Sequence, residues 1–327
     1  MSFKEIKGHN VPISILQSAL KQERMSSTYL FLGPDGIGKG LVAKMLAKSA
    51  NCLNNDAQDS CDACASCLKI DSGNHPDVHW IPPRETALGV SQASDAIKIE
   101  YIRQLQESIA LRPYEGRFKV FIIDNAHLLT IEASNAFLKT LEEPPAHSLI
   151  ILISSKPQLL LPTIISRCQK VRFFPLRKDA LAQMLRLDYT LDDILGHYLA
   201  YSCEGRIGRA LSLKGTSALD EKNRIIDYFF SDESASVFRE FASKDNIRNA
   251  LSVLASWLRD VYYLKTGMPH MELMHLDRLD ELLGAMPRYS FADLDSLLKL
   301  LTDTSLYLEQ NINPRLLLSN LRLRLRG

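Results

Sequence analysis

The sequence lacks any long hydrophobic run, and it lacks an excess of charge of one sign. No apolar stretch in the 327 residues approaches the roughly 18 residues that a transmembrane helix requires. The first ten residues, MSFKEIKGHN, lack the apolar region of a signal peptide, so a cytoplasmic location is expected. Lys and Arg number 39 against 38 Asp and Glu, a formal net charge of +1. This net charge excludes a positive electrostatic field over the whole molecule that would attract nucleic acid. A local basic patch is still compatible with it.

Internal repeats and low-complexity tracts are also missing, and the 46% hydrophobic and 24% charged residues are typical of globular proteins. A chain of 327 residues is longer than the roughly 250 to 300 residues at which one core stops growing. The patterns predict an α/β module over residues 1–175, a small helical module over 176–215 and a helical C-terminal module over 216–327.

The α/β prediction rests on apolar runs that alternate with helical patterns. Nearly continuous apolar runs such as SLIILISS are typical of strands that are buried on both faces of a parallel sheet, with helices covering each face. The predicted strands are the run from Tyr29, residues 75–83, 119–124, 148–155 and, less distinctly, 171–174. No such run follows residue 175, and leucine-rich helical spacings continue to the end of the chain.

The most informative motif is YLFLGPDGIGKGLVAK, residues 29–44, which predicts a strand, a glycine-rich turn and a helix. Gly33, Gly38 and Lys39 satisfy the pattern G-x-x-x-x-G-K, and Gly36 lies within the same turn. At this spacing the backbone N–H groups surround a phosphate and the lysine reaches the outer phosphates of a nucleotide. The sequence therefore predicts a phosphate loop of the kind that binds ATP or ADP.

Two residues depart from a working ATPase site. Gly40 stands where the motif supplies a Ser or Thr hydroxyl for Mg²⁺. Asp124, at the end of the run KVFIID, is placed to help hold Mg²⁺, but Asn125 follows it where a second acid would polarise the attacking water. Both departures remove groups that bind Mg²⁺ or activate water. The sequence therefore favours a loop that is kept for its structural role, where any bound nucleotide is not hydrolysed. An active P-loop ATPase, in which another group replaces the hydroxyl, remains the alternative.

Four of the six cysteines form a cluster, Cys52-x8-Cys61-x2-Cys64-x2-Cys67. In a reducing compartment this spacing favours metal over disulfides, and four thiolates suit a closed, tetrahedral, structural zinc site. Four incidental free thiols are the alternative. The isolated Cys168 and Cys203 are expected to be small buried side chains rather than nucleophiles.

Several polar residues have a functional and an ordinary interpretation. Arg167, in TIISRCQKV, is either a solvated surface charge or an arginine that acts in trans on the nucleotide of a neighbouring subunit. Arg209, in GRIGRAL, either faces a nucleotide from the second module or is a surface charge at a helix end. Ser154 and Ser155 end a strand, where they either sense a γ-phosphate or are simply solvated.

These motifs together carry a family resemblance. GPDGIGKG, the four-cysteine insert, RPYEGRFKVFIIDNAH, ASNAFLKTLEEPP, TIISRC and GRIGRAL occur in an order and spacing that resemble the bacterial clamp loader of DNA polymerase III, an AAA+ family. The resemblance covers residues 1–215 with specific motifs. Beyond them it is weaker, although NINPRLLLSNLRLRL is similar to the last helix of the family's collar domain.

The resemblance implies an AAA+ module with a zinc insert at about residues 52–67, a helical lid and a collar. It implies partners too: gamma/tau and delta subunits in a hetero-pentameric ring, the sliding clamp, and primer-template DNA, with no membrane partner. Gly40 and Asn125 resemble the family's non-hydrolysing subunit type more than its ATP-hydrolysing motors. In such a subunit Arg167 would be the arginine finger that completes a neighbour's ATP site.

Overall fold

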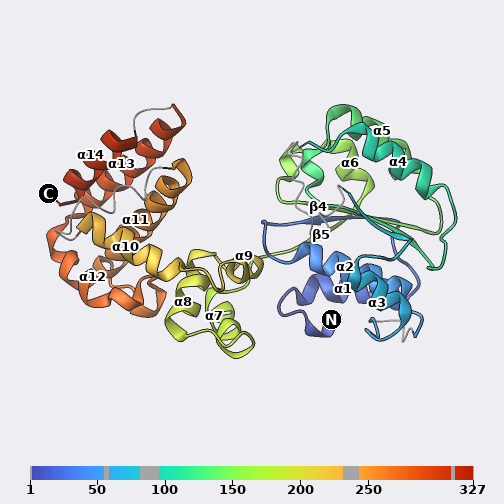
Figure 1. The fold of residues 1–327 in the computed structure, drawn as a ribbon, viewed down its shortest axis with the longest axis horizontal. Helices are drawn as coiled ribbons and strands as arrows, with labels where there is room; N and C mark the ends of the chain where they lie inside the picture. Colours follow the sequence, from blue (N-terminus) through green and yellow to red (C-terminus); the bar gives the residue numbers. More distant parts are fainter. Residues whose placement is uncertain (1, 55–58, 82–95, 231–242, 311–313, 327) are drawn as a thin grey trace. The chain divides into compact units, whose positions relative to one another are not determined.

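The computed structural model describes residues 2–54, 59–81, 96–230, 243–310 and 314–326. Their contacts separate them into two compact units (Figure 1): residues 1–176 with 205–209, and residues 177–204 with 210–327. Each unit has its own hydrophobic core. Within the described ranges, no helix is long and apolar enough to span a bilayer.

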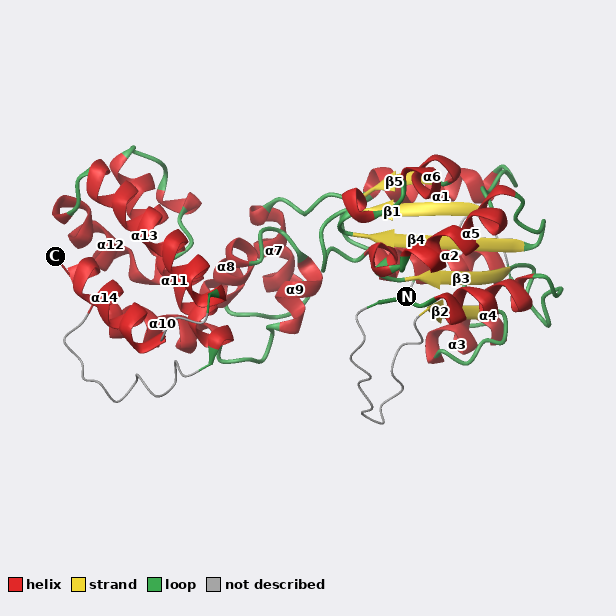
Figure 2. Cartoon of the chain, turned by 90° about the horizontal axis from the view of Figure 1, so that it is seen from above, coloured by secondary structure: helices red, strands yellow, loops and turns green. Residues whose placement is uncertain are grey.

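The first unit is built on a parallel sheet of five strands in the order β2-β3-β4-β1-β5 (Figure 2). The strands are β1 (Thr28–Leu32), β2 (Val78–Ile81), β3 (Lys119–Ile123), β4 (Ser148–Ser154) and β5 (Gln169–Arg172). All residues of β3 and β4 are buried, as their unbroken apolar runs predict. The predicted α/β fold class with a parallel sheet is confirmed.

Helices cover both faces of this sheet. On one face, α1 (Asn10–Lys21) and α2 (Lys39–Asn51) pack against the side of β1 that presents Tyr29 and Phe31. On the other face, α4 (Ile99–Ile109), α5 (Ile131–Glu142) and α6 (Pro162–Arg167) share a core with Leu30. Helix α3 (Ala65–Ser72) packs beside α2. Successive side chains of β1 therefore point to opposite faces of the sheet and contribute to the hydrophobic core on each face.

The fifth strand begins two residues earlier than the sequence predicts, at Gln169 instead of Val171. Its register on β1 pairs Tyr29 with Gln169 and Leu32 with Arg172. Gln169, Lys170 and Arg172 are exposed, and only Val171 within the strand is buried. An edge strand with this composition carries little hydrophobic signal, so its start is recognisable only from its pairing with β1.

A buried carboxylate organises the turn that precedes β3. Asp77 is fully buried, and its carboxylate accepts hydrogen bonds from the backbone N–H groups of Tyr114 (2.7 Å), Glu115 (2.9 Å) and Gly116 (2.8 Å). These residues belong to the RPYEGR motif. A Cβ atom on Gly116 would lie 2.8 Å from the Asn51 side-chain oxygen, so the turn has no room for a larger residue. The RPYEGR motif thus has a structural role, because its turn wraps around the Asp77 carboxylate.

The second unit is helical in its described part, as the sequence predicts. Its helices are α7 (Lys178–Leu187), α8 (Asp193–Ser202), α10 (Ala218–Phe230), α11 (Lys244–Lys265), α12 (Leu279–Ala285), α13 (Phe291–Glu309) and α14 (Pro314–Arg326). Helix α9 (Ile207–Ser212) spans a boundary, since residues 205–209 group with the first unit. The core of the second unit lies among α10 to α14 and includes the predicted stripe of α11 from Leu251 to Leu264.

Polar contacts connect α8 to the segment that follows α11. The His197 ring lies 2.7 Å from the Leu273 carbonyl oxygen, and the Tyr201 hydroxyl donates to the Met271 carbonyl at 2.7 Å. Asp260 and His275 are fully buried nearby. These contacts join residues on both sides of position 215 in one unit, so the boundary between a lid and a collar there remains a prediction.

Candidate functional site

The phosphate loop lies between β1 and α2 and folds around its own lysine. Lys39 is only 5% exposed, and its ammonium donates to the carbonyl oxygens of Gly33 (2.7 Å) and Pro34 (2.6 Å). Burial lowers the pKa of Lys39, and the nearby carboxylates of Asp35 and Asp124 partly oppose this effect. The predicted loop residues Gly36 and Gly38 both have left-handed backbone, with φ of 73° and 101°. The loop therefore has the glycine-dependent curvature of an anion-binding turn.

A second segment of the chain completes this loop. The Gly208 N–H donates to the Gly36 carbonyl oxygen at 2.7 Å, and a Cβ atom on Gly208 would lie 2.8 Å from that oxygen. The backbone N of Arg209 lies 3.2 Å from where a Cβ of Gly36 would stand. The GRIGR motif thus contacts the phosphate loop directly, which explains its second glycine and brings the predicted Arg209 next to the loop.

The acid after β3 is also close to the loop, while its neighbour has a backbone role. Asp124 interacts electrostatically with Lys39, and its carboxylate accepts from the Asn125 N–H at 3.0 Å. Asn125 has a φ of 51° and precedes a short 3-10 helix, Ala126–Leu128. Asn tolerates this left-handed conformation better than most residues. The structure therefore places Asp124 near Lys39 of the phosphate loop and gives Asn125 a conformational reason to follow it.

Two histidines beside the loop escaped the sequence analysis. The His9 ring lies 2.6 Å from the Ile37 carbonyl oxygen within the loop, and burial lowers its pKa. The His127 Nδ1 atom lies 3.3 Å from the hydroxyl of Ser154, a serine that is fully buried. The hydroxyl of Ser155 is buried and has no hydrogen-bond partner among the described residues. A lone histidine carries no spacing signal, so only the fold reveals these two.

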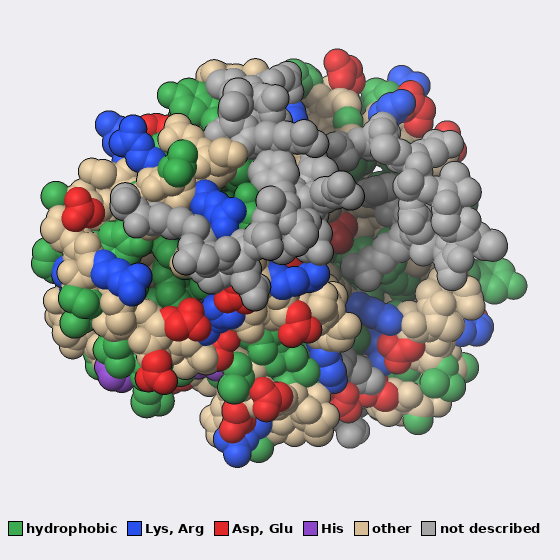
Figure 3. Space-filling model, turned by 60° about the vertical axis from the view of Figure 1, so that its left-hand side comes forward, with side chains coloured by type: hydrophobic (Ala, Val, Ile, Leu, Met, Phe, Trp, Pro, Cys, Tyr) green, Lys and Arg blue, Asp and Glu red, His purple; other side chains and the backbone are tan. Residues whose placement is uncertain are grey.

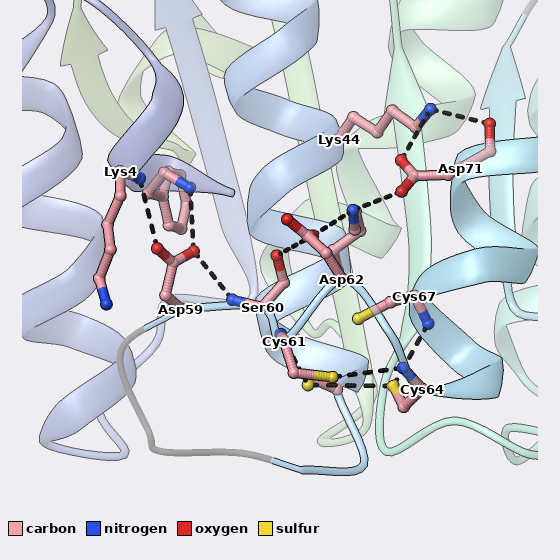
Figure 4. A network of polar contacts seen from close by, with 12 residues as sticks. Lys4, Lys44, Asp59, Ser60, Cys61, Asp62, Cys64, Cys67 and Asp71 are labelled. Carbon is pink, nitrogen blue, oxygen red and sulfur yellow. Dashed lines mark hydrogen bonds and ion pairs between the residues drawn. The ribbon is translucent and has the colours of Figure 1, made fainter. Parts of the chain in front are cut away.

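The four clustered cysteines come together as predicted. Their sulfur atoms all lie within 4.8 Å of one another, and those of Cys52 and Cys64 are 4.0 Å apart. A tetrahedral site with Zn–S distances of about 2.3 Å requires sulfur atoms about 3.8 Å apart. All four are free thiols, and Cys52 and Cys67 are buried. Figure 4 shows the sulfur atoms of Cys61, Cys64 and Cys67 close together. The donor set and its spacing fit a metal ion that is held by four sulfurs.

Backbone N–H groups point at these sulfurs. Cys61, Cys64 and Cys67 donate to the sulfur atoms of Cys52 (3.4 Å), Cys61 (3.3 Å) and Cys64 (3.5 Å) in turn. Burial acts to raise the pKa of Cys64, but hydrogen bonds from the N–H groups of Cys67 and Leu53 outweigh it and lower the pKa to about 6. These hydrogen bonds favour the thiolate of Cys64, which is the metal-binding form, whereas burial raises the pKa of Cys52 and Cys67.

Arg167 lies away from the phosphate loop. It ends α6, and its guanidinium pairs with the Glu142 carboxylate and donates to the Thr163 carbonyl oxygen at 2.9 Å. The Thr28 hydroxyl at the start of β1 donates to the Arg167 carbonyl oxygen. The structure therefore brings Gly33, Lys39, Asp124 and Arg209 together, whereas Arg167 lies beside the start of β1, at the other end of the strand from the phosphate loop. Cys168 and Cys203 are buried, as expected.

One face of the molecule is mixed in charge. On the face shown in Figure 3, Lys and Arg side chains lie scattered among Asp and Glu side chains. This arrangement agrees with the balanced composition.

The sheet order, the phosphate loop after β1 and the acid after β3 define a P-loop protein of the AAA+ class. The family model described as "DNA polymerase III, delta subunit" matches residues 8–177, and the one described as "DNA polymerase III, delta subunit, C terminal" matches residues 223–327. The chain belongs to this family of DNA polymerase III clamp-loader subunits.

Individual relatives include two Bacillus subtilis proteins. DNA polymerase III subunit delta' is 33% identical over 267 residues, which cover 78% of this chain and 77% of that protein. DNA polymerase III subunit tau is 37% identical over 179 residues, 55% of this chain but only 30% of tau. A solved Thermotoga maritima protein related to the gamma subunit of DNA polymerase III aligns over 96% of this chain and 98% of its own, with 16% identity and a TM-score of 0.49.

Proposed function

We propose that this chain is a delta prime subunit of the DNA polymerase III clamp loader, a stator that does not hydrolyse ATP. The observation that carries the proposal is the pairing of Gly40 with Asn125. An otherwise well-formed phosphate loop lacks both the hydroxyl that holds Mg²⁺ and the acid that activates water. Similarity to delta' over most of both chains supports it.

In this proposal the chain acts through its interfaces. It assembles with gamma/tau and delta subunits into a ring of five in the cytoplasm, and the ring loads the sliding clamp onto primer-template DNA. The collar, residues 216–327, joins the subunits of the ring, and the lid, residues 176–215, links the AAA+ module to the collar in the chain. Arg167 supplies its guanidinium to the ATP site of a neighbouring gamma subunit, where a cation stabilises the charge on the transferring phosphoryl group.

In this proposal the phosphate loop of the chain is a site that can bind nucleotide but does not hydrolyse it. Gly33, Gly36, Gly38, Lys39 and Asp124, with Arg209 from the GRIGR segment, surround the place where the phosphates of ATP or ADP would lie. The contacts of Lys39 with Gly33 and Pro34 must open for its ammonium to reach a phosphate. Nucleotide binding therefore competes with the contacts of Lys39 inside the loop. A bound nucleotide is not hydrolysed, because no group positions Mg²⁺ or the attacking water.

The cysteine cluster binds structural zinc in this proposal. Cys52, Cys61, Cys64 and Cys67 supply four thiolates and leave no ligand position open, so the ion has no catalytic role. Zinc is favoured over other ions because an all-thiolate, tetrahedral set is the one it uses in structural sites.

An active ATPase motor is the second candidate, favoured by the 37% identity to tau over 179 residues. The test is ATP hydrolysis and binding by the purified chain, measured with a coupled ATPase assay and a fluorescent ATP analogue. The stator proposal expects hydrolysis at background in both the wild type and Lys39→Ala. Robust hydrolysis that is abolished in Lys39→Ala overturns it and supports the motor.

A further inference from the structure

One buried lysine connects the cysteine cluster to the helix that carries the phosphate loop. Lys48 lies in the last turns of α2 and is fully buried. Its ammonium contacts two carboxylates at 2.6 Å each, from Asp62 and Asp71. Asp62 stands in the turn between Cys61 and Cys64, and Asp71 lies on α3 (Figure 4). A buried charge is tolerated only when it is paired, so the two carboxylates hold α2 and the cysteine module together.

Asp62 also acts on the cysteine site itself. Its backbone N–H donates a hydrogen bond to the sulfur of Cys67, and its side chain accepts from the Ser60 hydroxyl at 2.8 Å. Its φ of 58° is left-handed, which is the conformation that turns the chain from Cys61 toward Cys64. The contact with Lys48 therefore fixes a residue whose backbone N–H holds the Cys67 sulfur and whose turn connects Cys61 to Cys64.

Helix α2 extends this link to the phosphate loop. It runs from Lys39, whose ammonium lies in the loop, to Asn51, which directly precedes Cys52. Its 13 residues span about 20 Å at 1.5 Å per residue. One rigid element thus carries the phosphate-loop lysine at its start, Lys48 near its end and a metal ligand immediately after it.

A further contact fixes the module from the other side. The Asp59 carboxylate accepts from the N–H groups of Phe3 (2.9 Å) and Ser60 (2.8 Å), so it ties the cysteine segment to the first residues of the chain (Figure 4). The segment is therefore held to the unit on both sides of Cys61.

We propose that Lys48 is a positioning residue for the four-cysteine metal site and couples metal binding to the order of helix α2 and the phosphate loop. Without metal the four thiols keep only their hydrogen bonds with backbone N–H groups, and Asp62 is held less firmly. The buried ammonium of Lys48 then keeps the Asp71 carboxylate but loses its firm contact with Asp62. As a result, the hydrogen bonds of α2 open more often, starting at its C-terminal end and extending toward the phosphate loop. This proposal rests on the metal site proposed above, but it does not depend on whether the chain hydrolyses ATP.

The first experiment measures zinc affinity by competition with a colorimetric chelator in Lys48→Met and Asp62→Asn. Asn keeps the size and the tolerance of left-handed backbone and removes only the charge. Both variants are expected to bind zinc about 10- to 100-fold more weakly, the usual cost of losing a group that orients metal ligands. Lys44→Met is the matched control, because Lys44 lies one turn earlier, is one-quarter exposed and contacts Asp71 but not Asp62. Wild-type affinity in both test variants overturns the proposal.

Thermal unfolding separates this role from a merely structural one. A structural role lowers the unfolding temperature equally with and without zinc, whereas the proposed role also reduces the rise in unfolding temperature that zinc produces. An undiminished rise in both variants contradicts the proposal.

The second experiment needs no variant, so it stands even if the substitutions prevent folding. Hydrogen exchange of the wild-type chain is compared with zinc and after chelation. Amides of α2 are expected to exchange faster after chelation, whereas those of α5, on the opposite face of the sheet, stay unchanged. A change confined to residues 52–72, or an equal change in α5, overturns the coupling. Absence of zinc from the wild type overturns the metal site and the coupling together, while ATPase activity bears only on the proposed function.

Discussion

The hydroxyl of Thr28 donates a hydrogen bond to the carbonyl oxygen of Arg167 across 2.9 Å. Thr28 begins β1 and Gly33 follows its end. At about 3.3 Å per residue, the strand separates the arginine from the phosphate loop by about 16 Å. Arg167 therefore does not serve the loop of its own chain, and any catalytic use of its guanidinium requires a nucleotide from another subunit.

Arg167→Ala is expected to leave ring assembly intact and to lower the ATPase rate at the neighbouring site by about 10³-fold, the scale of losing an arginine finger. The measurement is ATP hydrolysis by the complex reconstituted with gamma/tau and delta. Arg177→Ala is the control, since that exposed side chain pairs with Asp179, two residues away in the sequence. An unchanged rate in the Arg167 variant would remove the finger assignment.

Metal analysis of the purified chain is expected to find about one zinc ion per chain, held by the four sulfurs that lie within 4.8 Å of one another. Cys64→Ser should lose the metal and lower the unfolding temperature, because one thiolate and its hydrogen bonds disappear. Cys203→Ala, which alters a buried cysteine outside the cluster, should retain zinc. Protein prepared without chelator and containing no metal would show that the cluster is not a zinc site.

Asp77→Ala is expected to destabilise the first unit by about 3 kcal/mol, because three backbone N–H groups lose a charged acceptor in a buried position. Denaturant unfolding measures the effect. Glu107→Ala, at an exposed position on α4, should change stability by less than about 0.5 kcal/mol. A small effect for Asp77→Ala would mean that water replaces the carboxylate in this turn.

Stability of the second unit is expected to fall as pH drops below about 6.5, owing to His275. Burial, with the positive charges of Lys222, Arg259 and Arg278, lowers the pKa of this histidine well below its ordinary value. The unfolded chain therefore takes up the proton first, and stability that is complete above the unfolded pKa is lost as pH falls toward the folded one.

The size of this effect follows from linkage. Relative to His275→Gln, the wild type should lose about 1.4 kcal/mol of unfolding free energy between about pH 7.5 and about pH 5.5. Asp260, which accepts from the His275 backbone N–H at 2.9 Å, remains in both proteins, so its own titration cancels in the difference. His270→Gln, at an exposed histidine of the same unit, should behave like the wild type. Parallel pH profiles for the wild type and His275→Gln would contradict the assignment.

Much of the first unit is predictable from the sequence because its central strands are continuous apolar runs, as in β3 and β4. The phosphate loop and the cysteine cluster are predictable too, since both depend on short spacings. Edge strand β5 is harder because most of its residues are exposed, and its start at Gln169 is set by pairing with Tyr29. Residue spacing in the sequence therefore predicts sites that lie within one segment. The bounds of an exposed edge strand are known only from its pairing in the folded sheet.

Contacts between distant segments leave no pattern in the sequence. Lys48 looks like any helical lysine, yet it meets Asp62 and Asp71, 14 and 23 residues away. Gly208 looks like a turn residue, but it lies against Gly36 because no side chain fits between the two backbones. The energetic reason for such residues is tertiary, a buried charge or a close backbone approach, so it appears only once the chain is folded.

The closeness of the four sulfurs also has a redox consequence. Cys52 and Cys64 have sulfur atoms 4.0 Å apart, so an approach of about 2 Å reaches the length of a disulfide bond. A bound metal ion would occupy these sulfurs, whereas oxygen is expected to oxidise the two thiols of the metal-free cluster to a disulfide, which removes two ligands at once. Loss of metal in air is then expected to persist until a reductant restores the thiols, so a bound metal would protect the cysteines that hold it.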